Sequence, residues 1–105
     1  MNATEKHILD TFKSLLLTKV KVHKLVLFGS RARGDADRFS DMDVLVVVET
    51  LDSTTENAIS DCAWEAGFEH GVVVVPVAFS QDEWEHGLER HSLLARAIEA
   101  EGIAV

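Results

Sequence analysis

Two short apolar runs, at residues 25–28 and 43–48, constrain this chain more than any other feature. A polar loop joins them, and it begins at Gly29, directly after the first run. Runs of this length that are rich in valine and leucine are typical of strands, and the second is apolar enough for a strand buried on both faces. The sequence therefore predicts two strands connected by a loop that carries the polar chemistry.

Two carboxylates stand where the second strand begins, at Asp41 and Asp43. Alternate residues of a strand face the same side, so these side chains would lie roughly 6–7 Å apart. Two carboxylates this close repel each other unless a cation lies between them. Mg²⁺ is suited to the position, because it prefers oxygen ligands and binds through one or two carboxylates together with substrate phosphates. We predict Asp41 and Asp43 as metal ligands and catalytic residues.

The loop before these aspartates has the residues that a phosphate group needs. Gly29 has no Cβ to obstruct an approaching phosphate, and Ser30 offers a hydroxyl. A helix that begins at Ser30 or Arg31 would direct free N–H groups at the same anion. Arg31 and Arg33 could neutralise a leaving pyrophosphate. With Ser40, which directly precedes the acidic pair, these are the predicted nucleotide-binding residues.

The order of these residues resembles a known signature. Gly29-Ser30, ten further residues and Asp41-Met42-Asp43-Val44 are similar to the motif of the DNA polymerase β-type nucleotidyltransferase superfamily. Within it, Gly-Ser-x-Ala-Arg-Gly followed by Ser-Asp-x-Asp resembles the minimal nucleotidyltransferases (MNT), small prokaryotic proteins often paired with a HEPN-domain partner. The resemblance implies Mg²⁺-dependent transfer of a nucleoside monophosphate, AMP from ATP, to a hydroxyl. In several such pairs it further implies that the acceptor is the partner, a toxin that the nucleotidyltransferase silences.

One departure from the superfamily pattern affects the expected activity. The superfamily usually has a third carboxylate on a later strand, where it ligates metal and activates the attacking hydroxyl. The corresponding run here, residues 71–79, contains no acid. Glu69, Asp82 and Glu83 flank this run and could reach the pair only if the strand is short or shifted. Catalysis could then be slow, partner-assisted or absent.

Three functions therefore stay open. The first is an enzyme that transfers AMP to a hydroxyl on a partner protein, as the antitoxin of a HEPN/MNT-type pair. The second is a weak or inactive nucleotidyltransferase-fold antitoxin that neutralises its partner by binding. The third is a nucleotidyltransferase for a small molecule such as an antibiotic, for which the chain is short because it has no second domain to hold the acceptor.

The length and charge of the chain limit the number of domains and the class of binding partner. The 105 residues predict one nucleotidyltransferase domain, 1–105, with a single modest core. The net charge of −8 argues against strong nucleic-acid binding, which needs a basic patch. Most of the basic residues fall in the first forty positions, and the rest of the chain is mostly acidic; among them are Lys13, Lys19, Lys21, Lys24, Arg31, Arg33 and Arg38.

The sequence also predicts where the protein works. The first residues lack the apolar core of a signal peptide, and the apolar runs are shorter than the ~20 residues of a membrane span. We expect a cytoplasmic protein without a membrane segment. The single cysteine, Cys62, lies on a predicted amphipathic helix and is expected to be a buried structural thiol.

The periodicity of the whole chain predicts an α/β fold, a small mixed sheet with helices packed on it. Three capping boxes are expected, at Asn2/Glu5, Ser53/Glu56 and Ser80/Glu83. Pro76 indicates that its strand lies at the edge of the sheet or is bulged. The final helix is expected to place Leu93, Leu94, Ala97 and Ile98 on one face. The expected elements are helices at 4–19, 53–67, a short one after 80 and 92–101, and strands at 25–28, 43–48 and 72–79.

Overall fold

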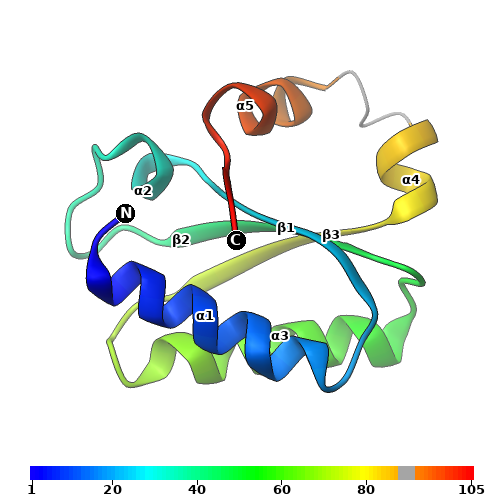
Figure 1. Ribbon diagram of the computed structural model, residues 1–105, viewed down its shortest axis with the longest axis horizontal. Coiled ribbons are helices and arrows are strands. Elements are labelled where there is room, and N and C mark those ends of the chain that lie inside the picture. The colour runs from blue at the N-terminus through cyan, green and yellow to red at the C-terminus, as the bar shows by residue number, and fades with distance from the viewer. Residues whose placement is uncertain (88–91) are drawn as a thin grey trace.

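The computed structural model describes residues 1–87 and 92–105 and arranges them as helices around one sheet (Figure 1). The elements in chain order are α1 (Ala3–Leu17), β1 (Val22–Phe28), α2 (Ser30–Arg33), β2 (Met42–Val48), α3 (Ser53–Phe68), β3 (Val74–Ser80), α4 (Gln81–His86), α5 (Leu93–Glu101) and β4 (Ile103–Ala104).

The sheet has the strand order β3-β2-β1-β4. Strand β1 runs antiparallel to β2 and β4, whereas β2 and β3 are parallel, so the sheet is mixed. Helices α1 and α3 cover one face, and α4 and α5 lie on the other (Figure 1). The predicted α/β fold with a small mixed sheet is confirmed.

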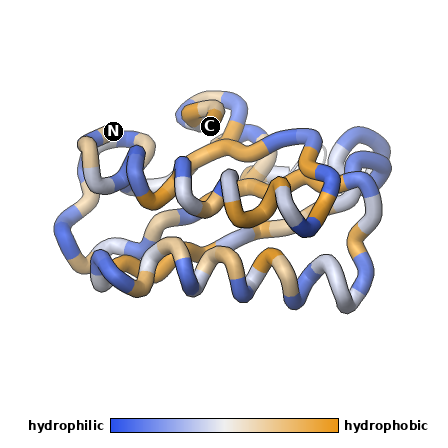
Figure 2. The backbone as a smooth tube through the Cα atoms, turned by 60° about the horizontal axis from the view of Figure 1, so that its bottom comes forward, coloured by the Kyte–Doolittle hydropathy of each residue, from blue (hydrophilic) through white to orange (hydrophobic). Residues whose placement is uncertain are grey.

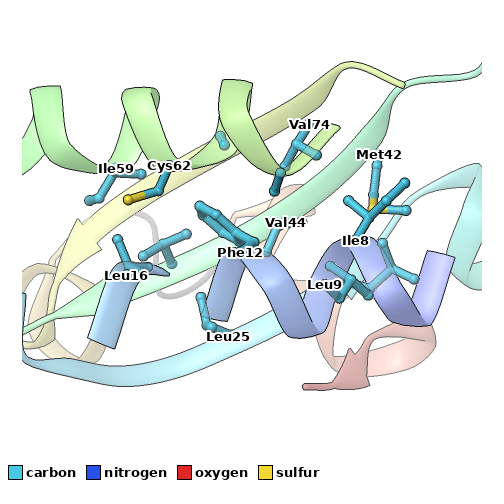
Figure 3. Close-up of a cluster of buried hydrophobic side chains, with 14 of the residues drawn as sticks. Ile8, Leu9, Phe12, Leu16, Leu25, Met42, Val44, Ile59, Cys62 and Val74 are labelled. Atoms are coloured by element: carbon cyan, nitrogen blue, oxygen red, sulfur yellow. The ribbon is translucent and has the colours of Figure 1, made fainter. Parts of the chain in front are cut away.

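The larger core lies between the sheet and the helices α1 and α3. Side chains from both helices point at those of β1, β2 and β3 in Figure 3. Phe12 is fully buried at its centre, and Cys62 is also fully buried, which confirms the expected structural thiol. Figure 2 shows how hydrophilic and hydrophobic residues alternate along these helices, as expected of helices with one buried face.

The alternation of β2 divides the chain's chemistry between the two faces. Val44, Val46 and Val48 belong to the core beneath α1 and α3, whereas Leu45 and Val47 belong to a second cluster beneath α5. Because side chains alternate, the predicted acidic pair faces the α5 side of the sheet. This assignment determines which elements can contribute to the site.

The helix ends follow the predicted caps, with one correction. The capping boxes at Asn2/Glu5 and Ser80/Glu83 are present. Helix α3, however, is capped by Asp52, whose carboxylate accepts from the Thr55 N–H at 2.8 Å. The Ser53/Glu56 capping box is therefore wrong by one residue, because a better acceptor precedes Ser53.

The remaining differences concern the edges of the sheet. Strand β3 is an edge strand, as Pro76 predicts, but it starts at Val74 rather than residue 72. The two-residue strand β4 was not predicted. In α5 the buried residues are Ala95 and Ile98, while Leu93 is 83% exposed, so the expected apolar face is rotated.

Among the described residues, no helix combines the length and the apolar character needed to cross a membrane.

Candidate active site

The site begins at Gly29, where β1 ends and the chain turns toward β2. Its φ of +79° lies in the region that L side chains rarely adopt. A Cβ at this position would lie 2.5 Å from Asp43 Oδ2. The backbone conformation and the contact with the carboxylate therefore both require glycine, and the β1–α2 turn lies directly against Asp43.

The two aspartates lie at the start of β2. Asp41 is exposed just before the strand, and Asp43 is half-buried within it. Burial raises the pKa of the Asp43 carboxyl, and the Asp41 carboxylate raises it further, while Arg33 lowers it. The two carboxylates therefore lie close enough for the charge of Asp41 to raise the pKa of Asp43.

Helix α2 is only one turn long and fixes the loop after Gly29. The Gly29 carbonyl accepts from the N–H groups of Ala32 and Arg33, at 3.1 and 3.0 Å. Gly34 ends the turn in the left-handed conformation, with φ +81°. The predicted helix start at Ser30 is confirmed, and the Ser30 hydroxyl has no hydrogen-bond partner within residues 1–87 and 92–105.

Arg31 points into the protein rather than toward the aspartates. Its guanidinium forms a buried ion pair with Glu5 at 3.1 Å, in which both side chains are less than a tenth exposed. Its Nε and Nη2 also donate to the Ser40 carbonyl, at 3.0 and 2.8 Å. Arg31 therefore ties the start of α1 to both ends of the loop, which is a positioning role and not a contact with a phosphate.

Ser40 is also used within the loop. Its carbonyl accepts from Arg31, and its hydroxyl accepts from the Asp37 N–H at 3.2 Å. The Asp37 carboxylate in turn accepts from the Phe39 N–H at 2.8 Å. In this structure Ser40 closes the turn that leads into Asp41. Its carbonyl and hydroxyl are engaged within that turn, so they do not form the contact with nucleotide that the sequence predicts.

Arg33 is the loop arginine that faces the site, and it already holds an anion. Its Nη1 donates to Glu101 Oε1 and Oε2 at 3.1 and 3.2 Å, and its Nε donates to Asp35 at 3.1 Å. The Gly29 N–H donates to the same Glu101 Oε1 at 3.2 Å. Hydrogen bonds to Asp35 and then Glu101 raise the pKa of Arg33 above its ordinary value. A carboxylate of α5 thus occupies the position predicted for phosphate.

Sequence reasoning missed Glu101 because its placement depends on a strand of two residues. In the antiparallel pairing of β4 with β1, Ile103 lies opposite Leu27. Two residues further along each strand, this register brings Glu101 beside Gly29. A strand as short as β4 has no periodicity to detect, so the only available signal is an acid directly before the helix stop at Gly102.

The third carboxylate is absent where the superfamily pattern would place it. Val75 of β3 lies opposite Asp43 in the parallel register, and β3 contains no acid. Asp82 and Glu83 lie on α4, beyond the other end of β3. Within residues 1–87 and 92–105 there is no cluster of three histidine, cysteine or acidic residues that could hold a metal. The donor set is limited to Asp41 and Asp43, two oxygen ligands suited to a Mg²⁺ that also binds substrate phosphates.

Comparison with known proteins identifies the family. Residues 7–104 match the family described as Nucleotidyltransferase domain. Because the match covers nearly the whole chain, the protein belongs to this family, and the resemblance carried by Gly29-Ser30 and the aspartate pair is confirmed.

Similar proteins support this assignment. The chain is 32% identical over 77 residues to the Methanocaldococcus jannaschii protein named "Putative protein adenylyltransferase MJ0141", covering 70% of this chain and 78% of that one. It also resembles a crystal structure of a toxin-antitoxin with AMP-PNP, with a TM-score of 0.60, 21% identity, and 95% of this chain and 70% of that chain covered. A Shewanella oneidensis structure, a tri-AMPylated HEPN toxin in complex with MNT antitoxin, matches with a TM-score of 0.53 and 19% identity over 96% and 67% of the two chains. At these identities the two structures show a shared fold, and the protein is a nucleotidyltransferase of that fold.

Proposed function

We propose that this protein transfers AMP from ATP to a hydroxyl of a partner protein, with Mg²⁺ held by Asp41 and Asp43. The hydroxyl oxygen bonds to the α-phosphorus, the bond to the bridging oxygen of the β-phosphate breaks, and pyrophosphate leaves. The hydroxyl proton passes to solvent, since no third carboxylate among the described residues is placed to accept it. Mg²⁺ would supply charge neutralisation at the phosphates.

The observation that carries the proposal is the placement of Asp43 against Gly29. A half-buried carboxylate with a raised pKa lies beside another carboxylate and beneath a turn where only glycine fits. This arrangement costs stability in the free protein, which is a common property of sites built to bind a ligand. A bound cation would remove the repulsion between Asp41 and Asp43.

Gly29 and Arg33 are the residues that would donate hydrogen bonds to the phosphates. Their N–H groups hold the Glu101 carboxylate, so the loop already has donors arranged around an oxyanion. A triphosphate has more charge than one carboxylate and would displace Glu101 from these donors. Ser30, whose hydroxyl is unused within the described residues, would add a further donor. Arg31 supports the loop from behind through Glu5 and the Ser40 carbonyl.

The partner would be a HEPN-type toxin, with this protein as its antitoxin. The relative carries the name "Putative protein adenylyltransferase MJ0141", and the similar solved structures are toxin-antitoxin complexes, one with AMP-PNP and one with an AMPylated toxin. These findings concern other proteins, and they support the proposal by analogy of fold and family.

The test combines the purified protein with Mg²⁺, ATP labelled at the α-phosphate and the protein encoded by the neighbouring gene. Label should appear on the neighbouring protein and should be lost with Asp41→Asn/Asp43→Asn. The matched control is Asp10→Asn/Glu99→Gln, which removes the same charge from exposed positions away from the two aspartates. Equal labelling by both double variants would show that the assigned aspartates are not the site.

The second candidate is an antitoxin that acts by binding alone. The specific observation in its favour is that Val75 lies opposite Asp43, where an acid would be expected. A stable complex with the neighbouring protein, without label on either chain, would favour this candidate. The Asp41→Asn/Asp43→Asn variant would then form the complex as tightly as the native protein.

A further inference from the structure

An exposed apolar surface lies away from the active site, on the opposite face of the sheet. A groove of about 570 Å³ runs between α3 and the edge strand β3. Its walls come from the outer side of α3 and from residues 71–76, which lie side by side with α3 in Figure 1. The residues that line it include Ala63, Trp64, Phe68, Val73, Val74 and Pro76.

Large apolar side chains are left in solvent around this groove. Trp64 is 67% exposed, Phe68 65% and Val73 62%. The Trp64 and Phe68 rings stack on each other, with centroids 4.6 Å apart and planes 25° apart. A pair of stacked aromatic rings has its shape fixed before binding, so it loses little side-chain entropy when a partner covers it. An exposed cluster of this kind marks a docking surface rather than an ordinary surface residue.

Acidic residues of α3 lie beside the two exposed aromatic rings. Residues four apart form a row along a helix, and the row next to Trp64 and Phe68 carries Asp61, Glu65 and Glu69. All three are exposed. Between Arg38 and Arg90 the sequence contains no lysine or arginine, so neither α3 nor β3 carries one.

The charges disfavour a second copy of the chain as the occupant. In a symmetric dimer the same patch meets itself, so the row of Asp61 and Glu65 would approach its own copy. Like charges brought together at an interface cost several kcal/mol by general estimates, roughly the energy that the aromatic pair could contribute. The occupant must therefore carry the opposite charge.

The backbone of β3 excludes simple strand addition. In the parallel register with β2, the peptide groups of Val74, Pro76 and Ala78 point away from β2. Pro76 has no N–H, so it interrupts the row of donors that an added strand would need. Binding must then depend on side chains inserted into the groove, which fits a helix with an apolar face.

From these observations we infer that the α3–β3 groove docks an amphipathic helix of a partner protein whose apolar face is flanked by lysine and arginine. The apolar residues of that helix contact Trp64, Phe68 and Val73, and its cations pair with Asp61 and Glu65. The surface lies on the α3 side of the sheet, whereas the aspartates of the active site face the α5 side. Docking therefore leaves the active site open, and it requires neither ATP nor Mg²⁺.

The test uses a designed helical peptide of about 18 residues, long enough for partial helicity in water, with leucine along one face and lysine elsewhere. Two matched peptides replace either all lysines with glutamate or all leucines with serine. Binding is measured by titration calorimetry without nucleotide. Only the peptide that has both leucine and lysine should bind.

Variants then locate the binding. Trp64→Ser should weaken the affinity for the leucine-lysine peptide about tenfold or more, because exposed aromatic anchors dominate such interfaces. Asp61→Lys/Glu65→Lys should weaken it as well and should allow the glutamate peptide to bind. The control is Leu93→Ser, which removes an equally exposed leucine from α5 and should leave the affinity unchanged. Circular dichroism checks that each variant is folded, as expected for exposed positions.

Three results would overturn the inference. The first is equal binding of the serine peptide, which would mean attraction by charge alone. The second is no binding of the leucine-lysine peptide, or binding that Trp64→Ser does not affect. The third is self-association in sedimentation velocity that Trp64→Ser abolishes, which would make a second copy the occupant.

Discussion

The loop of residues 29–43 and the α3–β3 groove differ in how their polar and apolar groups are satisfied. In the loop, Arg31 and Arg33 each have acidic partners within the chain, and the loop carbonyl of Ser40 has two donors from Arg31. In the groove, Trp64, Phe68 and Val73 stay in solvent, and the acids beside them have no lysine or arginine from the same region of sequence. The arginines of the loop are paired within the chain, whereas the apolar side chains of the groove would be covered only by a partner.

The difference corresponds to two functions, the positioning of a nucleotide by the loop and the docking of a partner by the groove. A site that positions a nucleotide needs a rigid frame, and the buried Glu5–Arg31 pair supplies it. A docking surface needs exposed apolar side chains, which contribute nothing to the isolated fold. Substitutions in the loop should therefore change stability and nucleotide binding, and substitutions in the groove should change only partner binding.

The largest effect is expected at Arg31. Arg31→Met would leave the Glu5 carboxylate buried without its partner and release the Ser40 carbonyl, at a cost of about 3–5 kcal/mol in the free energy of unfolding. Arg33→Met is the matched control, since Arg33 is about half exposed and solvent screens its ion pairs, so its loss should be much smaller. Urea unfolding of both variants measures the difference. Equal losses would mean that the loop is not supported by the buried pair.

The next effect is expected at Gly29, again with a matched control in the same loop. Gly29→Ala combines an unfavourable φ with a Cβ 2.5 Å from Asp43 Oδ2, whereas Gly34→Ala has a similar φ and no atom within 4 Å. We expect Gly34→Ala to cost about 1 kcal/mol and Gly29→Ala about 2–4 kcal/mol, because the second must also displace Asp43. Thermal unfolding and ATP binding would test both. If the two variants lose stability equally, the contact between Gly29 and Asp43 is not tight.

The residues of the candidate site were predicted from sequence more accurately than their contacts. The apolar runs predict the strands, and the motif at their ends predicts Gly29 and Asp43 as site residues, whereas the contact between the two is known only from the structure. The contacts of Arg31 could not be predicted from sequence, because its role depends on Glu5, which is 26 residues away and lies on α1. An arginine in a polar loop gives no sign of whether it faces solvent or the protein.

The edges of the fold were the least predictable. Strand β4 has two residues, and its pairing with β1 brings Glu101 to Gly29. The rotation of α5, which exposes Leu93 and buries Ala95, depends on how the helix packs under Val26 and Phe28 rather than on its own periodicity. Tertiary packing overrides local pattern in both cases.

A smaller effect is expected at Glu101, which occupies the donors assigned to phosphate. Glu101→Gln weakens this competition while preserving the shape of the side chain, so ATP should bind about two- to fivefold more tightly, as expected for a half-exposed ion pair. Glu99→Gln, an exposed position on the same helix, should not change the affinity. Calorimetric titration with ATP and Mg²⁺ measures both. Weaker binding in Glu101→Gln would indicate that Glu101 assists the nucleotide instead of competing with it.

The smallest effect is expected at Asp43, and its sign depends on pH. Burial and Asp41 raise the pKa of folded Asp43 above its unfolded value, so the fold favours the protonated form. That contribution is fully present below the unfolded pKa of about 3.9 and is lost as the pH rises through the folded pKa. Asp43→Asn should therefore stabilise the protein at neutral pH, by less than ~1 kcal/mol because the group is half-exposed, and the gain should vanish in acid.

Urea unfolding of Asp43→Asn and the native protein across a pH series measures this gain, and Asp10→Asn, at an exposed position on α1, should show none. Mg²⁺ with ATP should reverse the order, because the ligands stabilise only the protein that retains the carboxylate. Asp43 would then destabilise the free protein and stabilise the nucleotide complex, as expected of a metal ligand in the active site. A variant that is less stable than the native protein at neutral pH would instead make Asp43 a structural residue of the β1–β2 loop.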